Sequence, residues 1–261
     1  MKTRVNGTDI HYETSGGGGS WVTLSHSLAC DLSMWDDQLA ALCAHHRVLR
    51  FDTRGHGASA APPGPYTFEQ MASDVLGLWD ALGIERSHFV GLSMGGMIGQ
   101  HLALRAPQRL LRLVLADTAS RVPPEALPVW EERIRIVRAR GMEPMVEPTL
   151  ERWFTAPFRE AHPEIMARIG DAIRRTPVEG YAGCIHCIAR LDVTERLREI
   201  AIPALVLAGE QDLGTTPATA RAIAAAIPGA RLEILPSAAH LSNIEQAERF
   251  NRIVLAFLGE G

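Results

Sequence analysis

The sequence lacks any run of about 18 apolar residues, the length that a transmembrane helix needs. Its first residues, Met1 to Gly7, lack the apolar core of a secretory signal peptide. An excess of positive charge is also missing, because the formal net charge is −4. Neither nucleic acid nor a membrane surface is therefore an expected partner. These absences together favour a cytoplasmic protein, and nothing in the sequence indicates an oligomeric state.

Cysteine is scarce, with four residues among 261. Because no sign of secretion is present, the four are expected to be free thiols. Two of them lie in Cys184-Ile185-His186-Cys187, whose spacing is found in metal sites, but no second tight pair of ligands accompanies them. The glycine run 16–19 is not followed by the Lys-Ser/Thr pair of a phosphate-binding loop. We therefore expect no metal site.

Short apolar runs alternate with helical patterns over the first 120 residues and again near the end. The predicted strands are a hairpin over 4–12 that turns at Asn6-Gly7, then 21–24, 47–51, 88–92, 110–116, 204–208 and 231–235. The predicted helices are 32–45, 66–82 with Thr67 as N-cap, 95–105, 217–227 and 241–258. This alternation predicts an α/β fold with a mostly parallel sheet and helices on both faces.

The alternation stops between residues 121 and 197, where no convincing buried strand is found. Helical segments broken by prolines fill this stretch, which is too long for an ordinary loop. The sequence therefore predicts an α/β core made of residues 1–120 and 198–261, with an inserted helical cap over residues 121–197.

Ser93 lies in Gly91-Leu92-Ser93-Met94-Gly95, directly after a predicted strand and before a predicted helix. A G-x-S-x-G pattern in that setting is typical of a nucleophile elbow, a sharp turn that presents the serine hydroxyl at the sheet edge. The start of the following helix brings a positive dipole end to the same place. We therefore predict that Ser93 is the nucleophile of an acyl-transfer reaction.

A serine needs a histidine base, and the histidine needs a carboxylate that holds its tautomer. In this fold the three follow in the order serine, acid, histidine, in loops after successive strands. His240 follows the last predicted strand, and Asp212 follows strand 204–208, with Glu210 nearby. Asp117, at the end of strand 110–116, is the alternative acid. The predicted triad is Ser93, Asp212 and His240.

The reaction also needs donors for the negative charge that develops on the attacked carbonyl oxygen. One is expected from the backbone N–H of Met94, next to the nucleophile. The second is expected from the loop after strand 21–24, and there we predict the backbone N–H of Leu28 in His26-Ser27-Leu28.

These motifs resemble those of the α/β-hydrolase superfamily, and within it the chain is most similar to 3-oxoadipate enol-lactonases of aromatic catabolism. The resemblance rests on residues 52–59, 91–100, 117–119, 130–134, 151–155, 181–184 and 240–246, several of them in the predicted cap. It implies an α/β-hydrolase fold and hydrolysis of the enol-lactone to 3-oxoadipate through a serine acyl-enzyme, without a cofactor. It also implies a small lactone substrate whose carboxylate needs a cation, for which Arg133 beside Trp130 is the candidate.

Other functions on the same scaffold remain open at the level of sequence. An esterase, a C–C bond hydrolase or a perhydrolase acting on another small substrate would use the same triad. A ligand receptor without turnover is the alternative from a different class.

Overall fold

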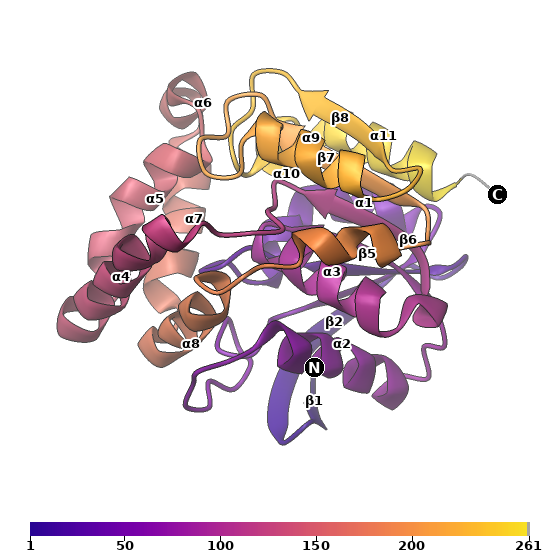
Figure 1. The fold of residues 1–261 in the computed structure, drawn as a ribbon, viewed down its shortest axis with the longest axis horizontal. Coiled ribbons are helices and arrows are strands. Elements are labelled where there is room, and N and C mark those ends of the chain that lie inside the picture. The colour runs from indigo at the N-terminus through magenta and orange to yellow at the C-terminus, as the bar shows by residue number, and fades with distance from the viewer. Residues whose placement is uncertain (260–261) are drawn as a thin grey trace.

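A computed structural model of the chain describes residues 1–259, and a single twisted sheet lies at its centre (Figure 1). Within these residues the sheet has eight strands, in the order β1-β2-β4-β3-β5-β6-β7-β8. The strands are β1 Lys2–Val5, β2 Thr8–Ser15, β3 Trp21–Ser25, β4 Arg47–Phe51, β5 Ser87–Leu92, β6 Leu110–Ala116, β7 Ala204–Gly209 and β8 Arg231–Leu235. Strand β2 pairs antiparallel with β1 and β4, and the other pairings are parallel. The predicted mostly parallel α/β sheet is confirmed.

Helices cover both faces of this sheet (Figure 1). Helix α3 packs against β5, β6 and α2, and α9 packs against β7 and β8, while α1 and α11 contact each other behind the sheet. Their bounds are α1 Asp36–Cys43, α2 Phe68–Ala81, α3 Met94–Arg105, α9 Pro217–Ala226 and α11 Ala247–Leu258. The single helix predicted over 241–258 is wrong in one respect. Gln246, with φ −125° and ψ 45°, leaves the helical conformation and separates α10 (Ser242–Glu245) from α11.

Five further helices, here called the cap helices, lie together beside the sheet at the left of Figure 1. They are α4 Leu127–Arg140, α5 Val146–Trp153, α6 Ala156–Ala161, α7 Pro163–Arg175 and α8 Val178–Ile188. The segment that carries them is closed at its base, because Val122 N donates to Leu191 O (2.9 Å) and Val193 N donates to Ser120 O (2.8 Å). The division into a core and a cap over residues 121–197 stays a prediction.

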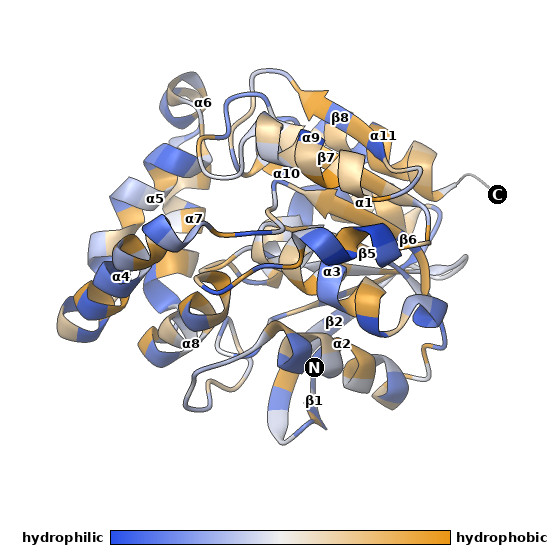
Figure 2. Ribbon diagram, in the orientation of Figure 1, coloured by the Kyte–Doolittle hydropathy of each residue, from blue (hydrophilic) through white to orange (hydrophobic). Residues whose placement is uncertain are grey.

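The distribution of hydropathy follows this architecture. Strands β5 and β7 are buried along their whole length, whereas α4 and α5 carry alternating apolar and polar stretches (Figure 2). In residues 1–259 no helix is long and apolar enough to cross a membrane. The predicted helix cap and hairpin turn are confirmed. The Thr67 side chain accepts a hydrogen bond from Gln70 N at the start of α2, and the chain turns at Asn6-Gly7 with positive φ angles of 49° and 77°.

A buried ion pair joins the loop after β4 to α2. Arg54 Nε and Nη2 donate to the two carboxylate oxygens of Asp74 at 2.5 and 2.7 Å, and the two side chains are 2% and 4% exposed. Asn6 Nδ2 donates to the same carboxylate at 3.1 Å. This paired geometry matters because a buried charge without its partner is strongly destabilising.

Asp74→Ala should therefore lower the free energy of unfolding by about 3–5 kcal/mol, since the Arg54 charge stays buried without compensation. Urea denaturation followed by circular dichroism measures this quantity. Glu199→Ala is the matched control, because Glu199 forms its ion pair with Arg196 at the surface, and this change should leave stability almost unaltered. Equal effects of the two substitutions would contradict the role given to the buried pair.

Candidate active site

Ser93 lies at the turn from β5 into α3 with φ 54° and ψ −114°, a conformation that is strained for a residue with a side chain. The turn is this tight because its neighbours are glycines. A Cβ added to Gly91 would lie 2.2 Å from Gly95 O, and one added to Gly95 would lie 2.0 Å from Ser25 O. Thr118 Oγ1 donates to Ser93 O at 2.7 Å and fixes the turn further. The structure thus places the serine hydroxyl at the carboxyl edge of the sheet.

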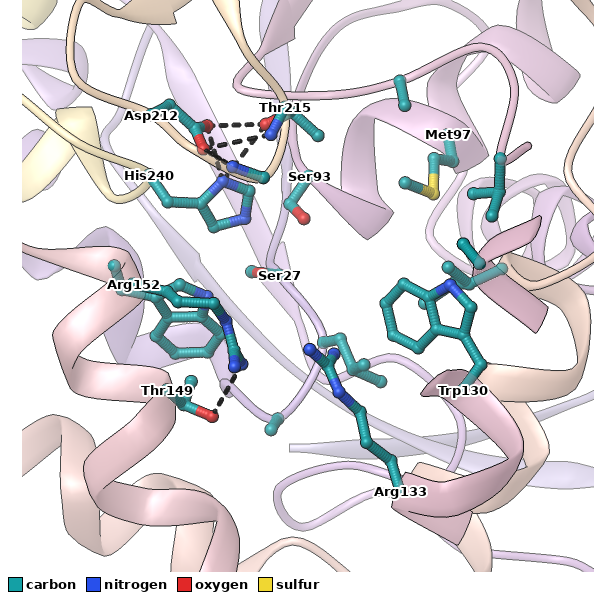
Figure 3. A pocket seen from close by; sticks show the side chains of 18 of the residues that line it. Ser27, Ser93, Met97, Trp130, Arg133, Thr149, Arg152, Asp212, Thr215 and His240 are labelled. Atoms are coloured by element: carbon teal, nitrogen blue, oxygen red, sulfur yellow. Dashed lines mark hydrogen bonds and ion pairs between the residues drawn. The ribbon is translucent and has the colours of Figure 1, made fainter. Parts of the chain in front are cut away.

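Asp212 and His240 meet in the loops that follow β7 and β8. His240 Nδ1 lies 2.7 Å from Asp212 Oδ2, and both side chains are buried (Figure 3). Figure 3 shows the imidazole ring facing the same pocket as Ser93. Because Nδ1–H donates to the carboxylate, the unprotonated Nε2 is left to accept a proton.

Of the two other acids weighed from the sequence, neither contacts His240. Glu210 is exposed and accepts a hydrogen bond from Ser237 N at 3.3 Å. Asp117 is fully buried, and its two oxygens are hydrogen-bonded to Gly209 N and to the Ser242 hydroxyl. The structure therefore brings Asp212, and not Asp117, to the histidine.

Thr215 is a member of this group that the sequence did not reveal. Its hydroxyl donates to Asp212 Oδ2 at 2.6 Å and lies 3.2 Å from His240 Nδ1. The backbone N–H groups of Gly214 and Thr215 donate to Asp212 Oδ1 at 2.8 and 3.0 Å. A threonine three residues after a candidate acid is too common a pattern to signal this contact.

The electrostatics of the pair favour an ionised acid. Burial opposes the charge of Asp212, but the His240 charge and the hydrogen bonds from His240 and Thr215 outweigh it and lower the pKa of Asp212 to about 2. Burial likewise opposes protonation of His240, yet the Asp212 carboxylate outweighs burial and raises the pKa of the imidazole. An imidazolium formed during a reaction would therefore be stabilised in place.

The two backbone N–H groups predicted as oxyanion donors, those of Leu28 and Met94, are not used in hydrogen bonds that hold the fold of the described residues. Met94 is the first residue of α3, where the N–H has no helical partner. In the loop after β3, Ser27 N donates to Met34 Sδ and Ala29 N donates to His56 Nε2 at 3.0 Å, whereas Leu28 N has no acceptor in residues 1–259. Leu28 N and Met94 N are thus available to an oxyanion.

Two buried histidines hold this loop in shape. His56 Nε2 accepts from Ala29 N, and His26 Nε2 accepts from Thr53 N at 2.9 Å. Both must be neutral to accept, and burial with the nearby His26 lowers the pKa of His56 to about 3. Ala29 has a positive φ of 61°, a conformation that is unfavourable for a residue with a side chain and that the bond from its N–H to His56 helps to hold. Sequence reasoning gave His56 no role.

A cavity of about 470 Å³ opens above Ser93 between the sheet edge and the cap helices. The predicted pair Trp130 and Arg133 lines it, with the Arg133 guanidinium 4.5 Å from the centre of the Trp130 ring. Arg152 of α5 lines the opposite wall, and its Nη2 donates to Thr149 Oγ1 at 3.3 Å (Figure 3). The cavity wall is otherwise largely apolar.

Arg133 and Arg152 have no acidic partner, since no carboxylate of residues 1–259 lies within 4.0 Å of either. Arg121 also lines the cavity but pairs with Asp192 at 3.6 Å. Burial and the charge of Arg133 lower the pKa of Arg152, as expected for a cation that lacks a counterion. Arg152 lies in the quoted stretch 151–155 but was not assigned a role from sequence.

The short cysteine motif lies elsewhere, on α8. Cys187 Sγ donates to Cys184 O at 3.0 Å, and both thiols are buried. No cluster of three or more His, Cys, Asp or Glu side chains in the described part of the chain is arranged to hold a metal ion.

The chain is similar to known hydrolases over nearly its whole length. Residues 16–247 match the alpha/beta hydrolase fold family. A 3-oxoadipate enol-lactonase from Acinetobacter baylyi is 41% identical over 234 residues, which cover 90% of this chain and 86% of that protein. The crystal structure of an enol-lactonase from Burkholderia xenovorans LB400 is 47% identical, with a TM-score of 0.96 and full coverage of both chains. A thermophilic esterase from Thermogutta terrifontis with malate bound is 32% identical, with a TM-score of 0.94 and coverage of 99% and 98%.

Asp212→Asn should lower kcat for any substrate of this site by about 10⁴-fold, because an amide cannot hold the histidine tautomer that leaves Nε2 free. Steady-state kinetics with purified protein measures the change. Glu210→Gln is the matched control two residues away and should leave kcat unaltered. A loss in the control as large as in the Asp212 variant would contradict the assignment.

Proposed function

The chain belongs to the alpha/beta hydrolase fold family, and from this we propose that it is a serine hydrolase that opens 3-oxoadipate enol-lactone to 3-oxoadipate. The resemblance to enol-lactonases first seen in the sequence is confirmed by the two similar lactonases. One observation carries the choice of substrate: two unpaired guanidinium groups, Arg133 and Arg152, face the cavity above Ser93 and His240. A carboxylate on the substrate would supply their missing partner.

In the proposed mechanism, His240 Nε2 takes the proton of the Ser93 hydroxyl as Oγ attacks the lactone carbonyl carbon. The oxygen of the tetrahedral intermediate accepts hydrogen bonds from the backbone N–H groups of Leu28 and Met94. Collapse breaks the bond between the carbonyl carbon and the ring oxygen, which receives the proton from His240. The enol formed stays attached to the acyl group and tautomerises to the ketone.

Hydrolysis of the acyl-enzyme follows through the same groups. His240 removes a proton from water, and the resulting hydroxide attacks the acyl carbon. The bond to Ser93 Oγ then breaks, and His240 returns the proton to the serine. The product carries a new carboxylate at the site of attack in addition to the one held by the arginines.

An esterase acting on open-chain esters is the second candidate, since it would use the same three side chains. The Thermogutta esterase supports it, because that protein is similar over nearly the whole chain and its structure holds a dicarboxylate, malate. Turnover of a carboxylated lactone compared with that of simple esters separates the two activities, and binding without turnover would indicate a receptor.

The decisive assay follows loss of the enol-lactone chromophore by absorbance, beside a panel of simple esters with and without a free carboxylate. We expect the highest kcat/KM for the enol-lactone. Ser93→Ala should lower kcat by about 10⁴-fold or more, because the covalent route is lost. Retention of more than a few per cent of activity in this variant would overturn the mechanism, and a faster ester would overturn the substrate.

Arg152→Ala and Arg133→Ala should each raise KM for the carboxylated lactone by about 10- to 100-fold, as loss of a charge-assisted hydrogen bond predicts. KM for a neutral ester should change little. Arg138→Ala is the matched control on α4, because Arg138 pairs with Glu179 at the surface. An equal rise in KM for lactone and neutral ester would remove the carboxylate-binding role.

A further inference from the structure

Asp117 is a buried acid for which the proposed mechanism has no use. It follows β6 with a positive φ of 44°, and its side chain is 0% exposed. Its Oδ1 accepts a hydrogen bond from Gly209 N at 2.7 Å, and Ser242 Oγ lies 2.5 Å from its Oδ2. Its two oxygens are therefore shared between two different segments of the chain.

These two segments carry the proposed acid and base. Gly209 ends β7, three residues before Asp212, and Ser242 begins α10, two residues after His240. The loops also touch directly, because Gln211 N donates to Ala238 O at 2.8 Å. Asp117 thus bonds to the residue directly before the Asp212 loop (residues 210–216) and to the residue directly after the His240 loop (residues 236–241).

The surroundings of Asp117 offer no charge to balance an ionised carboxylate. No arginine or lysine of the described residues lies within ion-pair distance of it. The titratable groups that act on it are Asp212, which is ionised, and His240, whose Nδ1 is already committed to Asp212. A second buried negative charge beside Asp212 is disfavoured.

We propose that Asp117 is a positioning residue that holds the Asp212 and His240 loops in register as a neutral carboxylic acid. In this form its carbonyl oxygen accepts from Gly209 N–H, and its hydroxyl donates to Ser242 Oγ. The site then contains one buried carboxylate charge, on Asp212, where the imidazolium needs it. This inference rests on the proposed roles of Ser93, Asp212 and His240 and not on the identity of the substrate.

The electrostatics agree with this geometry. Burial first, and the Asp212 charge second, raise the pKa of Asp117 to about 8, although His240 and the two hydrogen bonds oppose the rise. Above about pH 8, ionisation would place a second negative charge beneath the site. That charge would oppose the oxyanion that forms above Ser93.

Two substitutions of Asp117 test whether the residue acts as a neutral acid or as an ionised carboxylate. Asp117→Asn keeps both hydrogen bonds without a charge, since the amide oxygen accepts from Gly209 N–H and the amide NH₂ donates to Ser242 Oγ. We expect it to change kcat at pH 7 by less than about threefold, whereas Asp117→Ala lowers kcat by about 10- to 100-fold with little change in KM, because the loops shift. The decrease in kcat above about pH 8 should be lost in Asp117→Asn.

Kinetics should be measured with 4-nitrophenyl acetate beside the enol-lactone. If the enol-lactone is not the substrate, only the activity on the enol-lactone is absent, and the variants can still be compared with 4-nitrophenyl acetate.

Thermal unfolding gives a readout that needs no activity. Below the ordinary pKa of 3.8, Asp117 is protonated in the folded and unfolded protein alike. Between there and about pH 8, folding takes up a proton, so the stabilising contribution of this group is lost as pH rises through the folded-state value. The Tm of Asp117→Asn minus that of the wild type should therefore increase from pH 4 to pH 8.

Three results would each overturn the proposal. The first is a loss of kcat in Asp117→Asn as large as that in Asp117→Ala, since the charge would then be required. The second is wild-type kcat in a folded Asp117→Ala. The third is a Tm difference between Asp117→Asn and the wild type that does not vary with pH. If Asp117→Ala fails to fold, the Asp117→Asn kinetics and unfolding still decide.

Discussion

The strained backbone at Ser93 is the constraint on which the rest of the site depends. A φ of 54° at a residue with a side chain persists only where the surrounding structure holds it. The close backbone contacts at Gly91 and Gly95 hold the turn at Ser93. The same contacts fix the start of α3 against β3, so Met94 N and the loop that carries Leu28 are held at one edge of the sheet. The proposed nucleophile and the proposed oxyanion donors are thus positioned by one packing arrangement.

Charge is distributed across the cavity in a way that suits a carboxylated acyl substrate. Asp212, the acid at the base of the cavity, is hydrogen-bonded to His240 and Thr215 and so is not available to the arginines. The two unpaired guanidiniums lie on the cap side, where apolar walls strengthen their attraction for an anion. Under the proposed function, this arrangement would orient a substrate by its carboxylate while its carbonyl lies at Ser93.

Those parts of the fold and site that depend on local pattern could be predicted from the sequence, and those that depend on packing between distant segments could not. The strands, the elbow and the order Ser93, Asp212, His240 follow from periodicity and from loop positions after strands. The structure places those three residues together, while their catalytic roles remain a proposal. Thr215 was missed because a threonine three residues after an acid is a common pattern. His56 and Arg152 were missed because one acts on a residue 27 positions away and the other through an open cavity. The break at Gln246 was missed because the apolar spacing continues through it.

The end of cap helix α5 is bonded to the loop that carries His240. Substrate binding at the cap is therefore coupled to the position of the proposed base. Leu241 N donates to Trp153 O at 3.1 Å, and the Trp153 ring stacks on His240 with centroids 6.1 Å apart. Glu245 accepts from Thr155 N at 2.8 Å and from Ala239 N, so the end of α5 is tied to both sides of the histidine. Arg152 precedes Trp153 on the same helix. Under the proposed function, a carboxylate bound by Arg152 would be held by the same packing that holds His240, so binding energy gained at the cap would help to align the carbonyl with Ser93.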